Sequence, residues 1–509
     1  MHQDLTFEQS IGQHLMISLD GTELDEQFIH IIRTFKVGNV LLRRANLQNP
    51  EQIRSLCDDI RTLILEETTV EPCIAVVEDG GTFSTFPADV FHIPSAMAIG
   101  ATAEQGNAYT AGRMLGDQLQ HLGLQSAFAP NLSVSADRHE QITGTRTFAD
   151  DPETVCAFAS SMIRGLVDAQ VMSIGTGFPP VASCEVDETS GLHIIRTSKE
   201  QMLDAELAPL LRAIEAHIPA IQIAHVLIPA LESHMIPASL SRSVITDFLR
   251  HELDYKGLIF TDCVQEHPIA GRYGTAQSAL QALHAGADMI VHSHSYDDLH
   301  ETMQTLADGY HHDHLKWEDH EQSVIRIRAA KHRFQRKDID AVKDLVEHRS
   351  IVSAMMDRAI CAGNLPQPQV PELGECPLIL GPQMDRVPEI EHFASWLAKH
   401  VGGQGIITSV DPANEEIIGL MEPTRGATSI ICFTFDGCDH RGQLALANAM
   451  AGTGLPTIVI AMGTPHDLLY LADNSYSFAT FEYSELAFES IRRVVSGQRS
   501  ATGILPVHW

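Results

Sequence analysis

Short apolar runs alternate with amphipathic segments along residues 1–335. The runs are apolar throughout, which is typical of strands buried on both faces of a parallel sheet. Between them, stretches such as Lys199–Glu215 and Thr275–Ala285 carry apolar residues at helical spacing. About six to eight strand–helix units in one domain favour a (β/α)8 barrel over an open sheet. The predicted strands cover Val37–Leu42, Cys73–Glu78, Gln125–Pro130, Val171–Ile174, Ile221–Ala224, Leu258–Thr261 and Met289–His292.

The last third of the chain has a strand and helix pattern of its own. Trp317–Asp344 is rich in charges and predicts a connecting helix, and the proline-rich Asn364–Pro371 is typical of a linker. Beyond the linker, the predicted elements are strands at Pro377–Leu380, Ser429–Phe435 and Thr457–Ala461 and a helix at Gly442–Ala451. We therefore expect a TIM-like barrel over 1–335, a helical connector with linker over 336–371, and a smaller α/β sandwich domain over 372–509.

The balance of charges narrows the classes of partner. The 509 residues include 34 Lys and Arg against 66 Asp and Glu, a net charge of −32. A polyanion needs a basic face, so we expect neither nucleic acid nor an anionic membrane surface as a partner. No run of about 18 apolar residues occurs, and the charged N-terminal stretch does not resemble a signal peptide. The composition predicts a cytoplasmic protein with a small neutral or cationic ligand and leaves the oligomeric state open.

Cysteine, glycine and histidine patterns argue against bound cofactors. The nine cysteines include no C-x-x-C pair, which disfavours a disulfide framework and a zinc knuckle. Gly175-Thr176-Gly177 lacks the following helix that dinucleotide binding needs. The histidine-rich Tyr310–His320 is interpreted as a solvated helix approach, because a metal site needs buried supporting groups. We expect no metal and no cofactor.

Polar residues that closely follow the predicted strands are the candidates for chemistry, because active sites of parallel barrels lie at the carboxyl ends of the strands. Asp262 is the strongest carboxylate among them, since it ends an apolar strand. A strand-end aspartate could equally cap the next helix. The set comprises Glu78, Asp79, Asn131, Ser133, Thr176, His225, Asp262, His292 and His294.

Several short motifs follow one another along the chain in a recognisable order. Phe128–Leu132 and Gly144–Phe148 read F-A-P-N-L and G-T-R-T-F, and Gly257–Asp262 reads G-L-I-F-T-D. With these motifs the sequence resembles glycoside hydrolase family 3, particularly its β-N-acetylhexosaminidase branch. Further matching stretches, which extend the resemblance over nearly the whole chain, are Val37–Leu42, Ala224–Val226, Pro237–Ser241, Gly286–Met289, Gly463–Leu468 and Gly503–Val507.

The resemblance implies a barrel followed by an α/β sandwich and a retaining mechanism, in which a carboxylate attacks the anomeric carbon and an acid/base group protonates the leaving oxygen. Asp262 falls on the family's nucleophile and Arg146 on a sugar-binding arginine. His225, Glu78 and Asp79 are the other candidates for sugar binding. A structural ion pair for Arg146 and a structural role for His225 are alternatives.

Several positions depart from the family's pattern. The family motif D-Q-E-G-G-R reads V-E-D-G-G-T here, so Val77 and Thr82 replace a sugar-binding aspartate and arginine. The family loop K-H-F-P-G-H-G reads T-G-F-P-P-V-A, which places Thr176 and Gly177 at the sugar-binding lysine and its neighbouring histidine, and Val181 at the catalytic histidine. A valine cannot transfer a proton, so the usual acid/base dyad cannot form in its usual place.

Two functional hypotheses follow from this combination of matching and altered positions. The first is a glycosidase for a β-linked neutral or amino sugar, with Asp262 as the nucleophile and Glu185 or Asp187 as a replacement acid. The second is a catalytically lapsed member of the family that acts as a sugar-binding or scaffold protein. The intact Asp262 and Arg146 favour the first hypothesis, and the altered Thr176–Glu188 loop favours the second.

Overall fold

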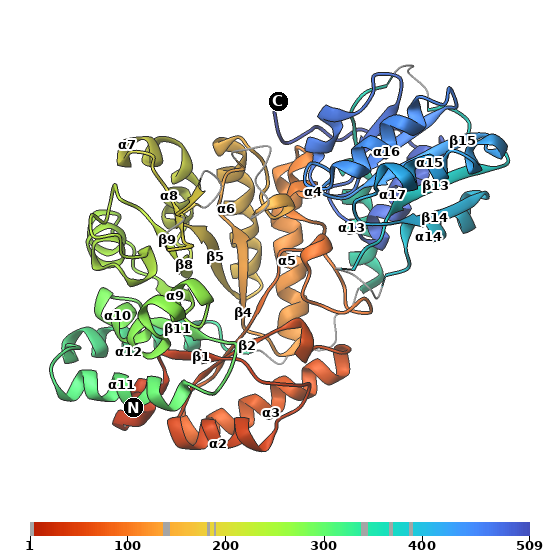
Figure 1. Cartoon of the computed structure of the whole chain (residues 1–509). Helices are drawn as coiled ribbons and strands as arrows, with labels where there is room; N and C mark the ends of the chain where they lie inside the picture. The colour runs from red at the N-terminus through yellow and green to blue at the C-terminus, as the bar shows by residue number, and fades with distance from the viewer. Residues whose placement is uncertain are drawn as a thin grey trace.

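Eight parallel strands form a closed barrel at the centre of the N-terminal part of the molecule (Figure 1). The computed structural model describes residues 5–135, 143–180, 184–187, 190–336, 345–365, 370–385 and 390–508. Neighbours around the barrel follow the order β1-β11-β10-β8-β5-β4-β3-β2. The strands are β1 (Leu15–Ile17), β2 (Asn39–Leu42), β3 (Cys73–Val77), β4 (Ser126–Asn131), β5 (Met172–Phe178), β8 (Ala220–Ile223), β10 (Leu258–Cys263) and β11 (Met289–His292).

The barrel confirms the predicted fold class, and seven of its eight strands lie where apolar runs predicted them. The strand without a prediction, β1, has three residues, all buried. It closes the barrel by pairing with β11 on one side and β2 on the other, through Ile17 opposite His292 and Met16 opposite Asn39. Three residues are too few for a periodic signal, so only tertiary pairing identifies this strand.

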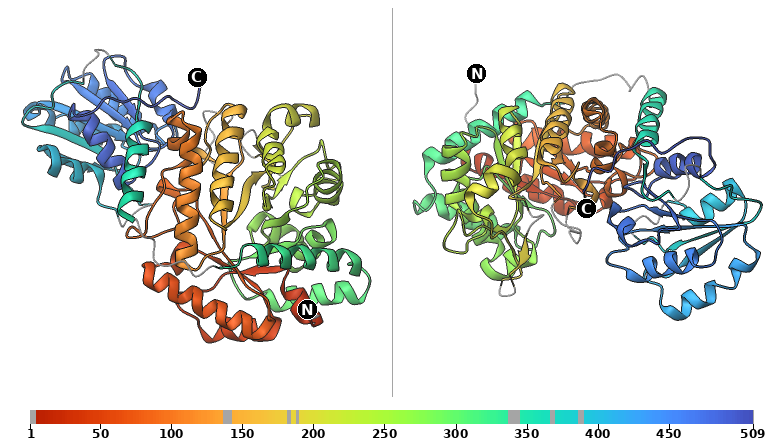
Figure 2. Two further views of the ribbon diagram at one scale, coloured as in Figure 1. Left: turned by 180° about the vertical axis from the view of Figure 1, so that it is seen from behind. Right: turned by 90° about the horizontal axis from the view of Figure 1, so that it is seen from above.

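Helices surround the barrel between successive strands (Figures 1 and 2). The predicted helix Lys199–Glu215 is interrupted, because a five-residue π-helical segment at Met202–Glu206 precedes Pro209, which has no N–H for a continuous hydrogen-bond ladder. A second π-helix covers Ser243–Glu252. The α-helices are α1 (Phe7–Gly12), α2 (Glu26–Phe35), α3 (Pro50–Thr68), α4 (Ala96–Ala101), α5 (Gln105–Leu122), α6 (Pro152–Asp168), α7 (Lys199–Gln201), α8 (Ala208–Glu215), α9 (His267–Tyr273), α10 (Thr275–Ala285), α11 (Leu299–His311) and α12 (Trp317–Arg333).

A second sheet of six strands forms the core of the C-terminal part, in the order β12-β17-β16-β15-β13-β14. Helices cover both of its faces, and β12 pairs antiparallel to β17 while the other strands are parallel. The elements are α13 (Leu345–Ala359), β12 (Cys361–Ala362), β13 (Pro377–Pro382), α14 (Phe393–Val401), β14 (Gln404–Thr408), α15 (Asn414–Leu420), β15 (Ser429–Thr434), α16 (Arg441–Ala451), β16 (Thr457–Ala461), β17 (Tyr476–Ala479) and α17 (Glu485–Val495).

A short sheet above the barrel consists of β6 (Glu185–Val186), β7 (His193–Ile194) and β9 (Val226–Leu227). It joins the segment that contains Glu185 to the connection that follows His225.

No helix in the described part of the chain is both long and apolar enough to cross a bilayer.

The two parts of the molecule share buried contacts beside the loop that follows β3. In α4, Met97 and Ala98 pack into the apolar core of the second sheet. Figure 1 shows α4 beside the C-terminal part of the molecule. After β17, the buried carboxylate of Glu482 accepts a hydrogen bond from Ser95 N at 2.7 Å, and the Ser95 hydroxyl donates to Phe481 O at 3.1 Å. The second domain therefore supports the β3–α4 loop of the barrel.

We predict that Glu482→Ala lowers the free energy of unfolding by about 1–3 kcal/mol, because Ser95 N would be left buried without an acceptor. Denaturant unfolding followed by circular dichroism measures the change. The control is Glu422→Ala, which removes an exposed glutamate of the same domain and should change stability by less than about 0.5 kcal/mol. Equal stabilities of the two variants would contradict a supporting role for Glu482.

Candidate active site

Asp262 stands at the carboxyl end of β10 and is half-buried at the rim of the barrel. Its Oδ1 accepts a hydrogen bond from Gln222 Nε2 at 3.1 Å and from Cys263 N at 2.9 Å. Gln222 lies on β8, the neighbour of β10 in the sheet, so two adjacent strands fix the carboxylate. The sequence placed Asp262 at this rim, and the structure gives it an oriented carboxylate there.

His225 is buried just beyond β8 and uses both ring nitrogens within the protein. Its Nε2 lies 2.9 Å from Cys263 O, and its Nδ1 lies 2.6 Å from Ser239 Oγ. A carbonyl can only accept, so Nε2 carries the proton and Nδ1 accepts from the serine hydroxyl. Burial lowers the pKa of His225 more than the charge of Asp262 raises it. His225 is therefore a neutral group that supports the turn after Asp262, with both ring nitrogens hydrogen-bonded within the protein, and its predicted sugar contact stays a prediction.

The carboxyl of Glu266 lies in the same cluster, although the sequence analysis did not select it. Glu266 N donates to Cys263 O at 3.0 Å, which closes a tight turn directly after Asp262. Burial, and then the negative charge of Asp262, raise the pKa of Glu266 to about 7. Glu266 lies four residues beyond Asp262, in the turn before α9 and not at the end of the apolar strand, so its position in the sequence carries no strand-end signal.

The β3–α4 loop presents two predicted sugar-binding carboxylates in different ways. Glu78 is buried, and its oxygens accept from Gly80 N, Ser84 Oγ and Thr85 N at 3.0–3.1 Å. Burial raises the pKa of Glu78 to about 7 despite these donors. The Glu78 carboxylate thus holds its own loop, and the expectation that it binds sugar stays a prediction.

Asp79 is the partner of Arg146. Its Oδ2 lies 3.6 Å from Arg146 Nη1, and the guanidinium carbon stands 5.9 Å from the centre of the Phe83 ring. Burial raises the pKa of Asp79, although Arg146 acts in the opposite direction. The Arg146 side chain is 30% exposed and the Asp79 side chain is 6% exposed. The pair therefore places a solvent-accessible cation beside a buried carboxylate.

Two positions that depart from the family's pattern have structural uses in this chain. Thr82 Oγ1 accepts from Tyr483 N at 2.7 Å, so the position of the family's arginine forms part of the contact with the second domain. Gly177 has φ +75°, and a Cβ there would lie 2.4 Å from Ser133 Oγ and 2.5 Å from Asn131 Oδ1. The backbone at Gly177 therefore leaves no room for the histidine side chain of the family.

Each of the two predicted replacement acids already has a polar partner in the structure. Glu185 is exposed and pairs with Arg196 Nε at 3.1 Å. Asp187 Oδ2 accepts from the hydroxyl and the N–H of Ser190 at 2.6 and 2.9 Å, and these bonds lower the pKa of Asp187. Val181, at the position of the family's catalytic histidine, lies outside the described residues.

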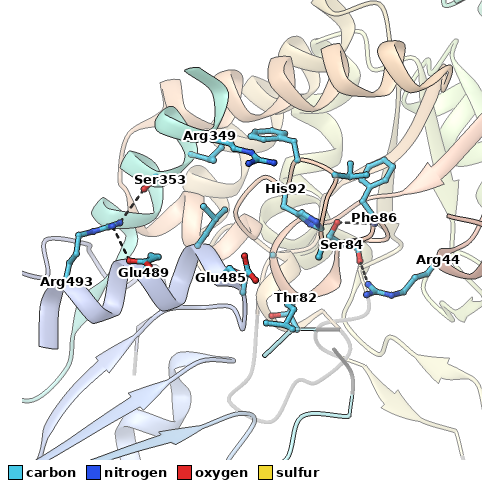
Figure 3. Close-up of a pocket in the computed structure, with 18 residues that line it drawn as sticks. Arg44, Thr82, Ser84, Phe86, His92, Arg349, Ser353, Glu485, Glu489 and Arg493 are labelled. Atoms are coloured by element: carbon cyan, nitrogen blue, oxygen red, sulfur yellow. Dashed lines mark hydrogen bonds and ion pairs between the residues drawn. The ribbon is translucent and has the colours of Figure 1, made fainter. Parts of the chain in front are cut away.

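A cavity of about 430 Å³ lies between the barrel and the second domain (Figure 3). Thr82 and His92 line it from the β3–α4 loop, Arg349 from α13, and Glu485 and Arg493 from α17. One side of the β3–α4 loop therefore holds the Asp79–Arg146 pair, and another side borders this cavity. The conformation of the loop depends on both domains.

Comparisons with known proteins agree with this arrangement. Residues 6–329 match the glycosyl hydrolase family 3 N-terminal domain. The chain is 30% identical to a beta-hexosaminidase of Chromobacterium violaceum, over 58% of this chain and 82% of that protein. It is 26% identical to beta-hexosaminidase A of Pseudoalteromonas piscicida, over 64% of this chain, and spans only 61% of that protein's length.

Among solved structures, a family 3 beta-N-acetylglucosaminidase from Paenibacillus sp. str. FPU-7 superposes with a TM-score of 0.93 and 27% sequence identity. The match covers 99% of each chain, so it includes both the barrel and the second sheet. With a family domain matched over residues 6–329 and a carboxylate fixed at the end of β10, the chain belongs to glycoside hydrolase family 3.

Proposed function

We propose that the protein is a retaining β-hexosaminidase-like hydrolase with Asp262 as its nucleophile. The observation that carries the proposal is the oriented Asp262 carboxylate, whose Oδ1 is held by Gln222 and by Cys263 N. Among the described residues both donors bond to Oδ1, which leaves Oδ2 for attack on an anomeric carbon. The resemblance to beta-hexosaminidases and to a beta-N-acetylglucosaminidase structure supports this class of substrate.

A small glycoside with a neutral or amino sugar suits the charges at the rim. The cations that the family carries at the positions of Thr82 and Thr176 are absent, and Arg146 is balanced by Asp79. An anionic sugar would therefore meet a surplus of carboxylates. In this proposal Arg146 binds sugar hydroxyls, with Asp79 as the group that orients its guanidinium.

The acid/base is the open part of the proposal. Glu185 and Asp187 remain the candidates on the loop where the family carries its dyad. For either to act, its carboxyl would have to leave Arg196 or Ser190 and approach the leaving oxygen above Asp262.

A sugar-binding or scaffold role without catalysis is the second candidate function. Thr82 and Gly177 favour it, since one forms an interdomain hydrogen bond and the other leaves no space for a sugar-binding side chain. Charge-assisted hydrogen bonds contribute about 1.5–3 kcal/mol each, so losing several weakens transition-state binding by orders of magnitude.

We predict that Asp262→Asn lowers nitrophenol release from aryl β-N-acetylglucosaminides by about three orders of magnitude or more, because the amide cannot form the glycosyl ester. Nitrophenol is a good leaving group, so the assay needs no strong acid catalyst. The control is Asp297→Asn, an exposed aspartate of the loop after β11, which should retain full activity. Equal background rates in wild type and Asp262→Asn, with sugar binding still measurable by calorimetry, would establish the non-catalytic alternative.

We predict that Arg146→Met raises KM for the same substrates about 10- to 100-fold, since it removes one charge-assisted hydrogen bond to the sugar. Steady-state kinetics measure KM, and thermal unfolding tests for a purely structural effect. Arg212→Met, which removes an exposed arginine paired with Glu215, serves as the control. An unchanged KM combined with a lower unfolding temperature would assign Arg146 to a structural ion pair.

A further inference from the structure

We propose that Glu266 is the acid/base catalyst that works with Asp262. This inference rests on the proposed glycosidase function and assigns the acid/base role to a different group, because Glu185 and Asp187 are engaged by Arg196 and Ser190. Glu266 is the last residue before α9, at the same end of the barrel as Asp262. The two carboxyls lie on one connection between β10 and α9.

The backbone between the two residues folds into a turn, and the charge of Asp262 acts on the Glu266 carboxyl. Because Glu266 N donates to Cys263 O at 3.0 Å, the turn holds the Cα atoms of Cys263 and Glu266 within about 7 Å. Asp262 Oδ1 accepts from Cys263 N, so its carboxylate is folded towards the same turn. Cys263 thus bonds to both residues, through its N–H to the Asp262 carboxylate and through its carbonyl oxygen to Glu266 N.

Neighbouring side chains hold this turn from two sides. Cys263 O also accepts a hydrogen bond from Nε2 of the buried His225 imidazole, at a distance of 2.9 Å. On the other side, Gln265 Nε2 donates to Ser295 O at 3.0 Å and to Asp298 Oδ1 at 2.8 Å. A catalytic carboxyl needs a backbone that is fixed before substrate binds, and the turn meets that need.

The Glu266 carboxyl itself remains free to act. Among the described residues it forms no hydrogen bond or ion pair, and it is half-buried. Burial and the Asp262 charge raise its pKa to about 7, so it is mainly protonated in mildly acidic solution, as a general acid must be. Glu78 has a similar pKa but is enclosed by three donors of its own loop.

The charge coupling also suits both steps of a retaining reaction. In the first step the Asp262 carboxylate bonds to the anomeric carbon, the glycosidic C–O bond breaks, and Glu266 gives its proton to the departing oxygen. The ester at Asp262 carries no charge, so one of the two causes of the raised pKa of Glu266 is gone. In the second step water attacks the anomeric carbon, gives a proton to the Glu266 carboxylate, and Asp262 leaves as a carboxylate.

The test compares wild type with Glu266→Gln on two β-N-acetylglucosaminides, one with a dinitrophenyl and one with an alkyl leaving group. We expect cleavage of the alkyl glycoside to fall about 10²- to 10⁴-fold in the variant, while ester formation from the dinitrophenyl glycoside changes little. The decline of wild-type kcat/KM above a pKa near 7 should disappear in the variant. Added azide should restore turnover and yield a glycosyl azide, which a purely structural role would not produce.

The control is Glu301→Gln, which changes an exposed glutamate of α11 and should retain the activity and pH profile of wild type. The double variant Glu185→Gln/Asp187→Asn tests the competing assignment of the acid/base. Unfolding midpoints identify any loss of fold. If cleavage requires Asp262 but Glu266→Gln keeps wild-type rates on both substrates, the assignment of Glu266 is overturned and the glycosidase proposal stands. If the double variant instead shows the leaving-group effect and azide rescue, the acid/base lies on its loop. If wild type shows no Asp262-dependent cleavage, both proposals are wrong.

Discussion

Closure of eight parallel strands is the constraint on which the rest of the structure depends. A parallel barrel directs the carboxyl ends of all its strands to one rim, and that rim is where Asp262, Glu266 and Arg146 lie. Closure itself relies on β1, whose three buried residues bridge β2 and β11. The rim is extended by the β3–α4 loop, and there the second domain contributes through Glu482 and Tyr483.

Two glutamates near this rim illustrate why burial alone does not identify a catalytic acid. Burial raises the pKa of both Glu78 and Glu266 to about 7. Glu78 accepts three hydrogen bonds from its own loop, so its carboxylate stabilises the conformation of that loop. Glu266 adjoins Asp262 without a donor among the described residues, and its pKa depends on the charge of the proposed nucleophile. The two glutamates therefore differ in the groups that surround their carboxyls and not in their pKa.

The sequence predicted the barrel well because fully buried strands are strongly apolar, as in Met289–His292, whose bounds are the same in the structure. It missed β14 because Gln404–Thr408 is largely exposed at the edge of its sheet and lacks that signal. Among the site residues, Asp262 was predictable from its position after an apolar strand. The use of Thr82 was not, since its partner Tyr483 is 401 residues away along the chain.

The central claim is that Asp262 forms a covalent bond to the sugar, and trapping of that intermediate tests it most directly. The probe is an N-acetylglucosaminyl fluoride with a second fluorine at C5, whose fluoride leaving group needs little protonation. Cleavage after Lys256 and Arg272 yields one peptide, Gly257–Arg272, which contains both Asp262 and Glu266. Tandem mass spectrometry should find the mass of one sugar on Asp262. An unlabelled peptide, or a label on another residue, would contradict the account.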